Sequence, residues 1–123
     1  MRRRNALLQA LHLFKALDVR VSVNEIIAFL YAAETEGLTV QEVADLARLT
    51  QSTASRSLRA LGVAGAAWSQ APALGLLEAF LNPQDGRSHV IHLTAQGHDL
   101  RDQLDAIIGK SAPIAGERAS RAA

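Results

Sequence analysis

The 123-residue sequence contains no cysteine, which excludes disulfides, thiolate nucleophiles and cysteine-ligated zinc or iron–sulfur sites. It is also poor in aromatic residues, which make up 4% and so predict an aliphatic, helical core. No apolar run has the length of a membrane span. Three arginines at 2–4 precede an apolar stretch, but Gln9, His12 and Lys15 interrupt it, which argues against a signal peptide. We expect a cytoplasmic protein without a membrane segment.

The sequence also lacks a large excess of either positive or negative charge. The chain has 13 basic and 12 acidic residues, a net charge of +1. Within residues 38–61, Arg48, Arg56 and Arg59 stand against Glu42 and Asp45, again a small excess. Binding to a polyanion would therefore depend on the positions of a few cations, because the net charge is too small to provide general electrostatic attraction.

Catalytic and metal-binding patterns are missing too. His89 and His92 are three residues apart in a predicted strand and should point to opposite faces, so we do not expect them to share a metal ion. No glycine-rich phosphate loop is present. We expect neither enzymatic activity nor a cofactor. The other polar residues that we interpret as non-catalytic are His12, His98, Ser52, Ser55, Ser57, Asp99, Asp102 and Asp105.

What the sequence does contain is a pair of short helical patterns between Thr39 and Leu61. Thr39 and Glu42 form a T-x-x-E capping box, which starts a first helix at Val40. Apolar residues recur along it at helical spacing until Leu49 and Thr50 break the run. Two short amphipathic helices joined by a polar step predict a helix-turn-helix over residues 38–62. The apolar positions of the first helix are Val40, Val43, Ala44 and Ala47.

The second helix of this pair begins after Thr50, a favourable N-cap, and ends at Gly62. Ala54 and Leu58 mark its apolar face. Serines and arginines share the opposite, exposed stripe, which suits a DNA major groove because guanidiniums pair with guanine edges or phosphates. The alternative is that these arginines are ordinary solvated surface residues. The candidate DNA-binding residues here are Thr50, Gln51, Ser52, Thr53, Ser55, Arg56 and Arg59.

A β-hairpin follows the helix-turn-helix. From Leu76 the chain reads LLEAFLNPQDGRSHVIHL, two apolar segments of strand length around the turn-forming residues 82–88. Thr94 then caps a last helix, and Gly109 and Pro113 lie at or beyond its end. A hairpin directly after a helix-turn-helix is typical of a wing.

These motifs resemble the MarR family of winged-helix transcription regulators, whose wing carries Asp-x-Arg and whose next helix opens with Leu-Thr-x-x-Gly. Here the two motifs are Asp85-Gly86-Arg87 and Leu93-Thr94-Ala95-Gln96-Gly97, and the resemblance covers residues 22–108. It implies a mainly α fold with a small β-hairpin. It also implies that Arg87 enters the minor groove, where a narrow groove concentrates negative potential, and that Asp85 holds the wing.

The chain departs from the family pattern in two places. Residues 62–75, rich in glycine and alanine, are longer than the usual connection between recognition helix and wing. They either carry Trp68 onto the core or form an insertion that contacts DNA or a partner. The first wing strand has Ala79 and Phe80 where relatives often carry basic residues, which weakens the expected phosphate contact of the wing.

The rest of the chain predicts one winged-helix domain over 1–110, with a wing at 74–93 and a flexible tail at 111–123. A helix over 5–17 and a second from the Ser22–Glu25 capping box to Gly37 precede the helix-turn-helix. By the resemblance, helices in 1–20 and 94–110 form a homodimer; the alternative is that their apolar faces only cover the monomer core. The candidate dimerisation residues are Leu7, Leu11, Phe14, Leu100, Leu104 and Ile107.

The sequence therefore predicts a dimeric regulator, a MarR-type repressor that binds double-stranded DNA specifically. Dimerisation would present two recognition helices to major grooves about 34 Å apart. The alternative is a winged-helix module that binds protein, which the low net charge and Trp68 favour. The family often binds small anionic aromatic effectors, and no residue set here identifies one.

Overall fold

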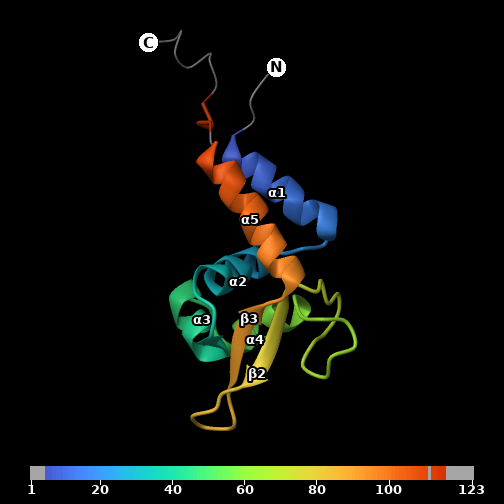
Figure 1. Cartoon of the computed structure of the whole chain (residues 1–123), viewed down its shortest axis with the longest axis vertical. Helices are drawn as coiled ribbons and strands as arrows, with labels where there is room; N and C mark the ends of the chain where they lie inside the picture. The colour runs from blue at the N-terminus through green and yellow to red at the C-terminus, as the bar shows by residue number, and fades with distance from the viewer. Residues whose placement is uncertain (1–4, 111, 116–123) are drawn as a thin grey trace.

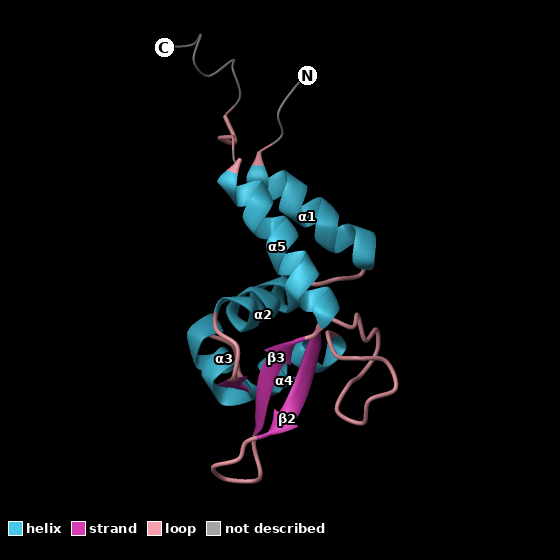
Figure 2. Ribbon diagram, viewed as in Figure 1, coloured by secondary structure: helices cyan, strands magenta, loops and turns pink. Residues whose placement is uncertain are grey.

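The structure, a computed structural model, describes residues 5–110 and 112–115. The arginines at 2–4, and residues 111 and 116–123 of the predicted tail, lie outside the described residues. The described residues form five helices and a small sheet, which confirms the predicted mainly helical fold (Figure 2). The elements are α1 (Ala6–Leu17), α2 (Val23–Glu34), β1 (Leu38–Thr39), α3 (Val40–Ala47), α4 (Gln51–Ala60), β2 (Leu77–Leu81), β3 (His89–Leu93) and α5 (Ala95–Gly109).

All five helices start at a side chain that accepts a hydrogen bond from the first turn. The predicted capping boxes are present in α2, at Ser22, and in α3, at Thr39. Each supplies a partner for otherwise unpaired N–H groups at its helix start. Single N-cap side chains begin the other three helices: Asn5, Thr50 and Thr94.

The sheet has one strand more than the predicted hairpin. Its order is β1-β3-β2, and both pairs are antiparallel. β1 is only two residues long, and Leu38 lies opposite Ile91. Gly37 donates its N–H to the Ile91 carbonyl at 2.8 Å. The backbone thus already bonds to β3 at Gly37, just before β1, and α2 ends at Glu34 instead of at the predicted Gly37.

The molecule divides into two ends (Figure 1). At one end α1 lies along α5, and the start of α1 and the end of α5 lie near each other. At the other end α2, α3 and α4 lie beside and behind the sheet, and the β2–β3 turn projects away from the body. Within the described part of the chain, no helix is both long enough and apolar enough to cross a bilayer.

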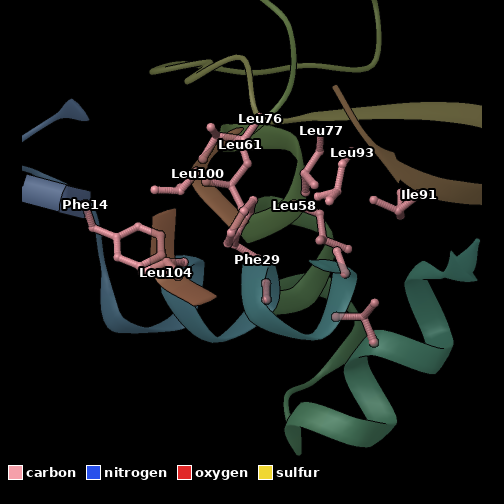
Figure 3. Packing of buried hydrophobic residues seen from close by; sticks show 13 residues of the cluster. Phe14, Phe29, Leu58, Leu61, Leu76, Leu77, Ile91, Leu93, Leu100 and Leu104 are labelled. Carbon is pink, nitrogen blue, oxygen red and sulfur yellow. The ribbon is translucent and has the colours of Figure 1, made fainter. Parts of the chain in front are cut away.

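One continuous core joins the two ends (Figure 3). Phe14 from α1 and Phe29 from α2 meet edge to face, with ring centroids 5.8 Å apart. The other large members are aliphatic, as predicted, and come from α4, α5, the sheet and the segments flanking them. They include Leu58, Leu61, Leu76, Leu77, Ile91, Leu93, Leu100 and Leu104.

This packing corrects part of the predicted dimer surface. Phe14, Leu100 and Leu104 are each at most 5% exposed and belong to the chain's own core. They have little surface left for a second subunit, because α1 and α5 of the same chain pack against each other. Leu7 and Leu11 are 58% and 45% exposed, and Ile107 is half-buried.

The Leu-Thr-x-x-Gly motif forms the joint between the sheet and α5. The Thr94 hydroxyl donates to the Gly75 carbonyl at 2.6 Å and accepts from the Gly97 N–H at 3.0 Å. The Thr94 N–H donates to the Leu76 carbonyl at 3.0 Å. A Cβ at position 97 would collide with that same carbonyl, so only glycine allows this close approach. The motif therefore fixes where α5 leaves the winged-helix part.

Candidate nucleic-acid interface

Helix α4 is the second helix of the helix-turn-helix. Thr50 caps it by accepting the Thr53 N–H at 3.2 Å, and its hydroxyl also donates to the Thr53 hydroxyl at 2.9 Å. The turn before it begins at Arg48, which ends α3 in the left-handed conformation with φ 57°. Ala54 and Leu58 are fully buried, as predicted. The opposite side of α4 therefore faces outward.

The exposed side of α4 differs from the predicted stripe. Ser52 and Arg56 are exposed, whereas Ser55 and Arg59 are half-buried. Helical spacing separates two rows: Ser52 and Arg56 form one, and Gln51, Ser55 and Arg59 form the next. The first row is open to solvent, and the second turns toward the wing.

Arg59 is half-buried because residues 62–75 cover it. The loop folds back over the end of α4, where the Gln70 N–H donates to the Arg59 carbonyl at 3.0 Å. The Arg59 side chain then donates from Nη1 to the Trp68 carbonyl at 3.0 Å and from Nε to Ser55 Oγ at 3.1 Å. Its Cζ lies 5.7 Å from the centroid of the Trp68 ring. The ring is half-buried and packs against the core, which supports the packing interpretation of this loop.

The wing turn is held by Asp85, as the resemblance implies. Its Oδ1 accepts the N–H groups of Arg87 at 2.9 Å and Ser88 at 3.0 Å, and its Oδ2 accepts the Ser88 hydroxyl at 2.8 Å. These bonds lower the pKa of Asp85, the Arg87 N–H contributing most. Gly86 sits between them with φ 68°, a conformation that suits glycine. The Arg87 side chain is left exposed.

Between α4 and the wing lies an open groove of about 400 Å³. The start of α3, the second row of α4, the loop residue Trp68 and the wing turn all contribute to its walls. It brings together five of the predicted site residues and seven residues that were not among them. Among its lining are the predicted Gln51, Ser55, Arg59, Asp85 and Arg87, with Trp68, Asn82, Ser88 and His89 as additions.

The remaining predicted residues either lie beside the groove or form hydrogen bonds at the start of α4. Ser52 and Arg56 stand on the neighbouring row of α4, and Thr50 and Thr53 are bonded to each other at its start. Asn82 could have been found from the Asn-Pro turn, because its Oδ1 accepts the Gln84 N–H at 3.0 Å, a local turn bond. The rings of Trp68 and His89 lie 6.4 Å apart, but the two residues are distant in the sequence, so only the tertiary structure shows that they are neighbours.

A second polar cluster lies at the joint with α5. Glu36 accepts the Leu93 N–H at 2.9 Å, and its carboxylate lies 3.0 Å from His98 Nε2 and 3.6 Å from His92 Nδ1. The Leu93 N–H, and to a lesser extent His98 and His92, lower the pKa of Glu36. Across residues 5–110 and 112–115, no group of three or more histidine, aspartate or glutamate side chains is arranged to hold a metal ion.

Solved structures of bacterial regulators share this architecture. A Staphylococcus aureus MepR–DNA complex superposes with a TM-score of 0.64 at 22% identity, over 85% of this chain and 74% of that one. The fold is the winged helix of the MarR regulators. The PcaV regulator of Streptomyces coelicolor gives a TM-score of 0.58 at 20% identity, over 85% and 71% of the two chains. Ligand-free MarR from E. coli gives 0.58 at 16% identity, over 85% and 72%.

No family model matches the sequence, and no curated protein matches it either. The likeness to the MarR fold is therefore one of structure. What the chain does with this fold follows from its own groove and surface.

Proposed function

We propose that this protein is a dimeric regulator of transcription that binds double-stranded DNA specifically and represses by occluding a promoter. The observation that carries the proposal is the presence of two exposed cations on neighbouring elements: Arg56 on α4, on the row beside the groove, and Arg87 in the wing turn that lines the groove. A helix such as α4 fits the major groove of B-DNA, and a hairpin arginine fits the adjacent minor groove. The DNA complex of the structurally similar MepR supports the same use of the fold.

Dimerisation belongs to the proposal because one chain offers few cations. Phosphate contacts provide most of the affinity for DNA, and a net charge of +1 leaves little beyond Arg56, Arg59 and Arg87 near the groove. A second copy doubles those contacts and adds a second recognition helix. The surface available for it is the exposed part of α1 and the end of α5, where Leu7, Leu8, Leu11 and Ile108 are 41% to 62% exposed.

Within this proposal the predicted DNA-binding residues other than Arg59, together with Asp85, have the following roles. Ser52 and Arg56 face the bases of the major groove, where small serines let the helix approach closely. Thr50 and Thr53 keep the start of α4 in place, and Gln51 and Ser55 lie on the row that turns toward the wing. Arg87 enters the minor groove, and Asp85 holds the turn that carries it.

The test is binding to duplex DNA across a salt series, first with genomic fragments to recover a sequence motif. Under the proposal the fragments share a near-palindromic site, and affinity falls steeply with salt. Replacing Arg56 with alanine should cost about 1 to 3 kcal/mol on that site and relax the preferred base at one position. Unchanged affinity after replacing both Arg56 and Arg59 would contradict the proposal and favour a protein-binding module.

A further inference from the structure

The loop between α4 and the wing contacts the side chain of Arg59 through Trp68. We propose that Trp68 is a positioning residue that holds the Arg59 guanidinium in place for a backbone phosphate of the DNA. This inference rests on the proposed function, because it assigns a ligand to the groove between α4 and the wing. It follows from the position of that groove and from the contacts of Arg59.

The position of the groove identifies its ligand. Major and minor grooves of a duplex are separated by a single sugar–phosphate strand. When α4 lies in the major groove and the Arg87 turn in the next minor groove, that strand must cross the space between them. This space is the groove lined by Ser55, Arg59 and Trp68 on one side and by the wing turn on the other. A phosphate is therefore the chemical group that reaches Arg59.

Arg59 is the cation that lines this groove from α4, and its orientation is already fixed. Nε is bonded to Ser55 Oγ, Nη1 is bonded to the Trp68 carbonyl, and the guanidinium lies over the Trp68 ring. Neither hydrogen bond uses Nη2. A free arginine loses rotamer entropy when it binds, whereas a side chain that is already held loses less. Arg59 therefore differs from Arg56, which is exposed on the neighbouring row.

The loop that supplies Trp68 is itself anchored. Its backbone donates from Gln70 to Arg59 and from Leu74 to Ala60, at 3.0 and 3.1 Å. At Gly62 the loop passes so close that a Cβ would collide with Ser69. The Trp68 ring also lies 6.4 Å from the ring of His89, on wing strand β3. Trp68 thus lies between the end of α4 and the wing, in the lining of the groove.

One negative group lines the same groove and limits the affinity. The Asp85 carboxylate is bonded to the Arg87 and Ser88 N–H groups and to the Ser88 hydroxyl, which lowers its pKa and keeps it charged. It would repel a phosphate. A held guanidinium opposite it is then the local source of attraction, which makes the placement of Arg59 matter more than its charge alone.

The experiment is a double-mutant cycle on DNA affinity. Wild type, Trp68→Leu, Arg59→Ala and the double variant are titrated by anisotropy against a labelled duplex of about 30 base pairs and mixed sequence, long enough for two half-sites. Leucine keeps an apolar side chain against the core but removes the ring. Val63→Ala, at an exposed position of the same loop, is the matched control and should leave affinity unchanged.

We expect Trp68→Leu to weaken binding about two- to five-fold when Arg59 is present, and not at all when Arg59 is alanine. Arg59→Ala should also reduce the slope of log K against log salt by about one per subunit, as expected for a lost phosphate contact. Equal weakening by Trp68→Leu in both backgrounds, or an unchanged slope in Arg59→Ala, would overturn the inference. Absence of any salt-dependent binding by wild type would instead overturn the proposed function, and the inference with it.

A second measurement keeps the test decisive if Trp68→Leu does not fold. Trp68 is the only tryptophan in the chain, so the intrinsic fluorescence of the protein reports on this site alone. Saturation with the duplex should change its emission in the wild type, and the change should be absent in Arg59→Ala. An unchanged emission in wild type that is demonstrably bound to DNA would contradict the assignment.

Discussion

The two ends of the molecule differ in how their surface side chains are held. At the groove end, the side chains at the site are bonded to one another: Asp85 holds the wing turn, and Ser55 and Trp68 hold Arg59. At the α1–α5 end, the side chains of Leu7 and Leu11 are 58% and 45% exposed. Held polar groups are ready for a ligand, whereas exposed apolar side chains gain most from being covered.

This difference indicates which surface depends on a second copy. The groove needs no residue from elsewhere to take its shape, so one chain can present it. The α1–α5 end is where association would add stability, because covering apolar surface is favourable by about 25 cal/mol per Å². Four variants test this division, two at or near the joint between the ends and one at each end.

The largest effect is expected at the joint. Gly97→Ala places a Cβ against the Leu76 carbonyl and the Leu93 side chain, and should lower the free energy of unfolding by about 3 kcal/mol. Thermal or denaturant unfolding measures it. Gly109→Ala, in the same helix, has nothing within 4 Å of the added methyl and is the matched control. A stability loss of the same size in both would mean that the close approach at Gly97 is not the cause.

The next effect concerns the apolar end. Replacing both Leu7 and Leu11 with glutamate should leave the monomer fold intact, because both are exposed, and should weaken self-association by about 2 kcal/mol or more. Analytical ultracentrifugation gives the association constant, and DNA affinity should fall in parallel. Ala16→Glu, on the opposite face of α1, should change neither. A dimer that survives the double substitution would move the interface elsewhere.

A smaller effect is expected at the wing. Arg87→Ala should weaken binding to the recovered site by about 1 kcal/mol, and should reduce the preference for A·T pairs at the flanks, since the arginine senses minor-groove width. Binding to sites with altered flanks measures this. Gln84→Ala, at an exposed position of the same turn, serves as the control. Affinity that is indifferent both to the flanks and to Arg87→Ala would remove the proposed role.

The smallest effect is expected at Glu36. Its lowered pKa means that the unfolded chain binds the proton more readily, so Glu36 contributes stability at neutral pH. That contribution is lost as pH falls below about 4.3 and through the lowered value. Glu36→Gln should therefore cost about 0.5 kcal/mol at pH 7 and flatten the acid limb of the stability curve. If the free energy of unfolding falls with acid in the same way in both proteins, Glu36 does not contribute to the pH dependence of stability.

Much of the fold could be predicted because its signals are local. Thr39 and Glu42, or Thr94 and Gly97, act within one helical turn, so the residue pattern alone indicates where a helix begins. The wing was also predictable, since turn residues flanked by apolar segments act locally. Strand β1 was not predicted, because two residues carry no periodicity and Leu38 becomes a strand only by pairing with Ile91.

The candidate site divides in the same way. Arg56 and Arg87 were predicted and are exposed, because helix spacing and a turn motif are enough to place them. Arg59 was predicted to be exposed too, and the prediction failed because a loop with no regular pattern folds back on it. Trp68 gave no signal beyond being a lone aromatic residue in a small-residue segment. Its partners, Arg59 and His89, are 9 and 21 positions away.

The sequence by itself determined the helix starts, the wing turn and the likeness to the MarR fold, because these depend on hydrogen bonds and periodicities within a few residues. Only the tertiary structure decided which side chains of those elements remain open. It buried Phe14, Leu100 and Leu104 in the chain's own core, left Leu7 and Leu11 exposed, and held Arg59 against Trp68. The physical reason is that the local pattern shows which face of a helix is apolar, whereas the exposure of these particular side chains depends on contacts between segments that are distant in the sequence.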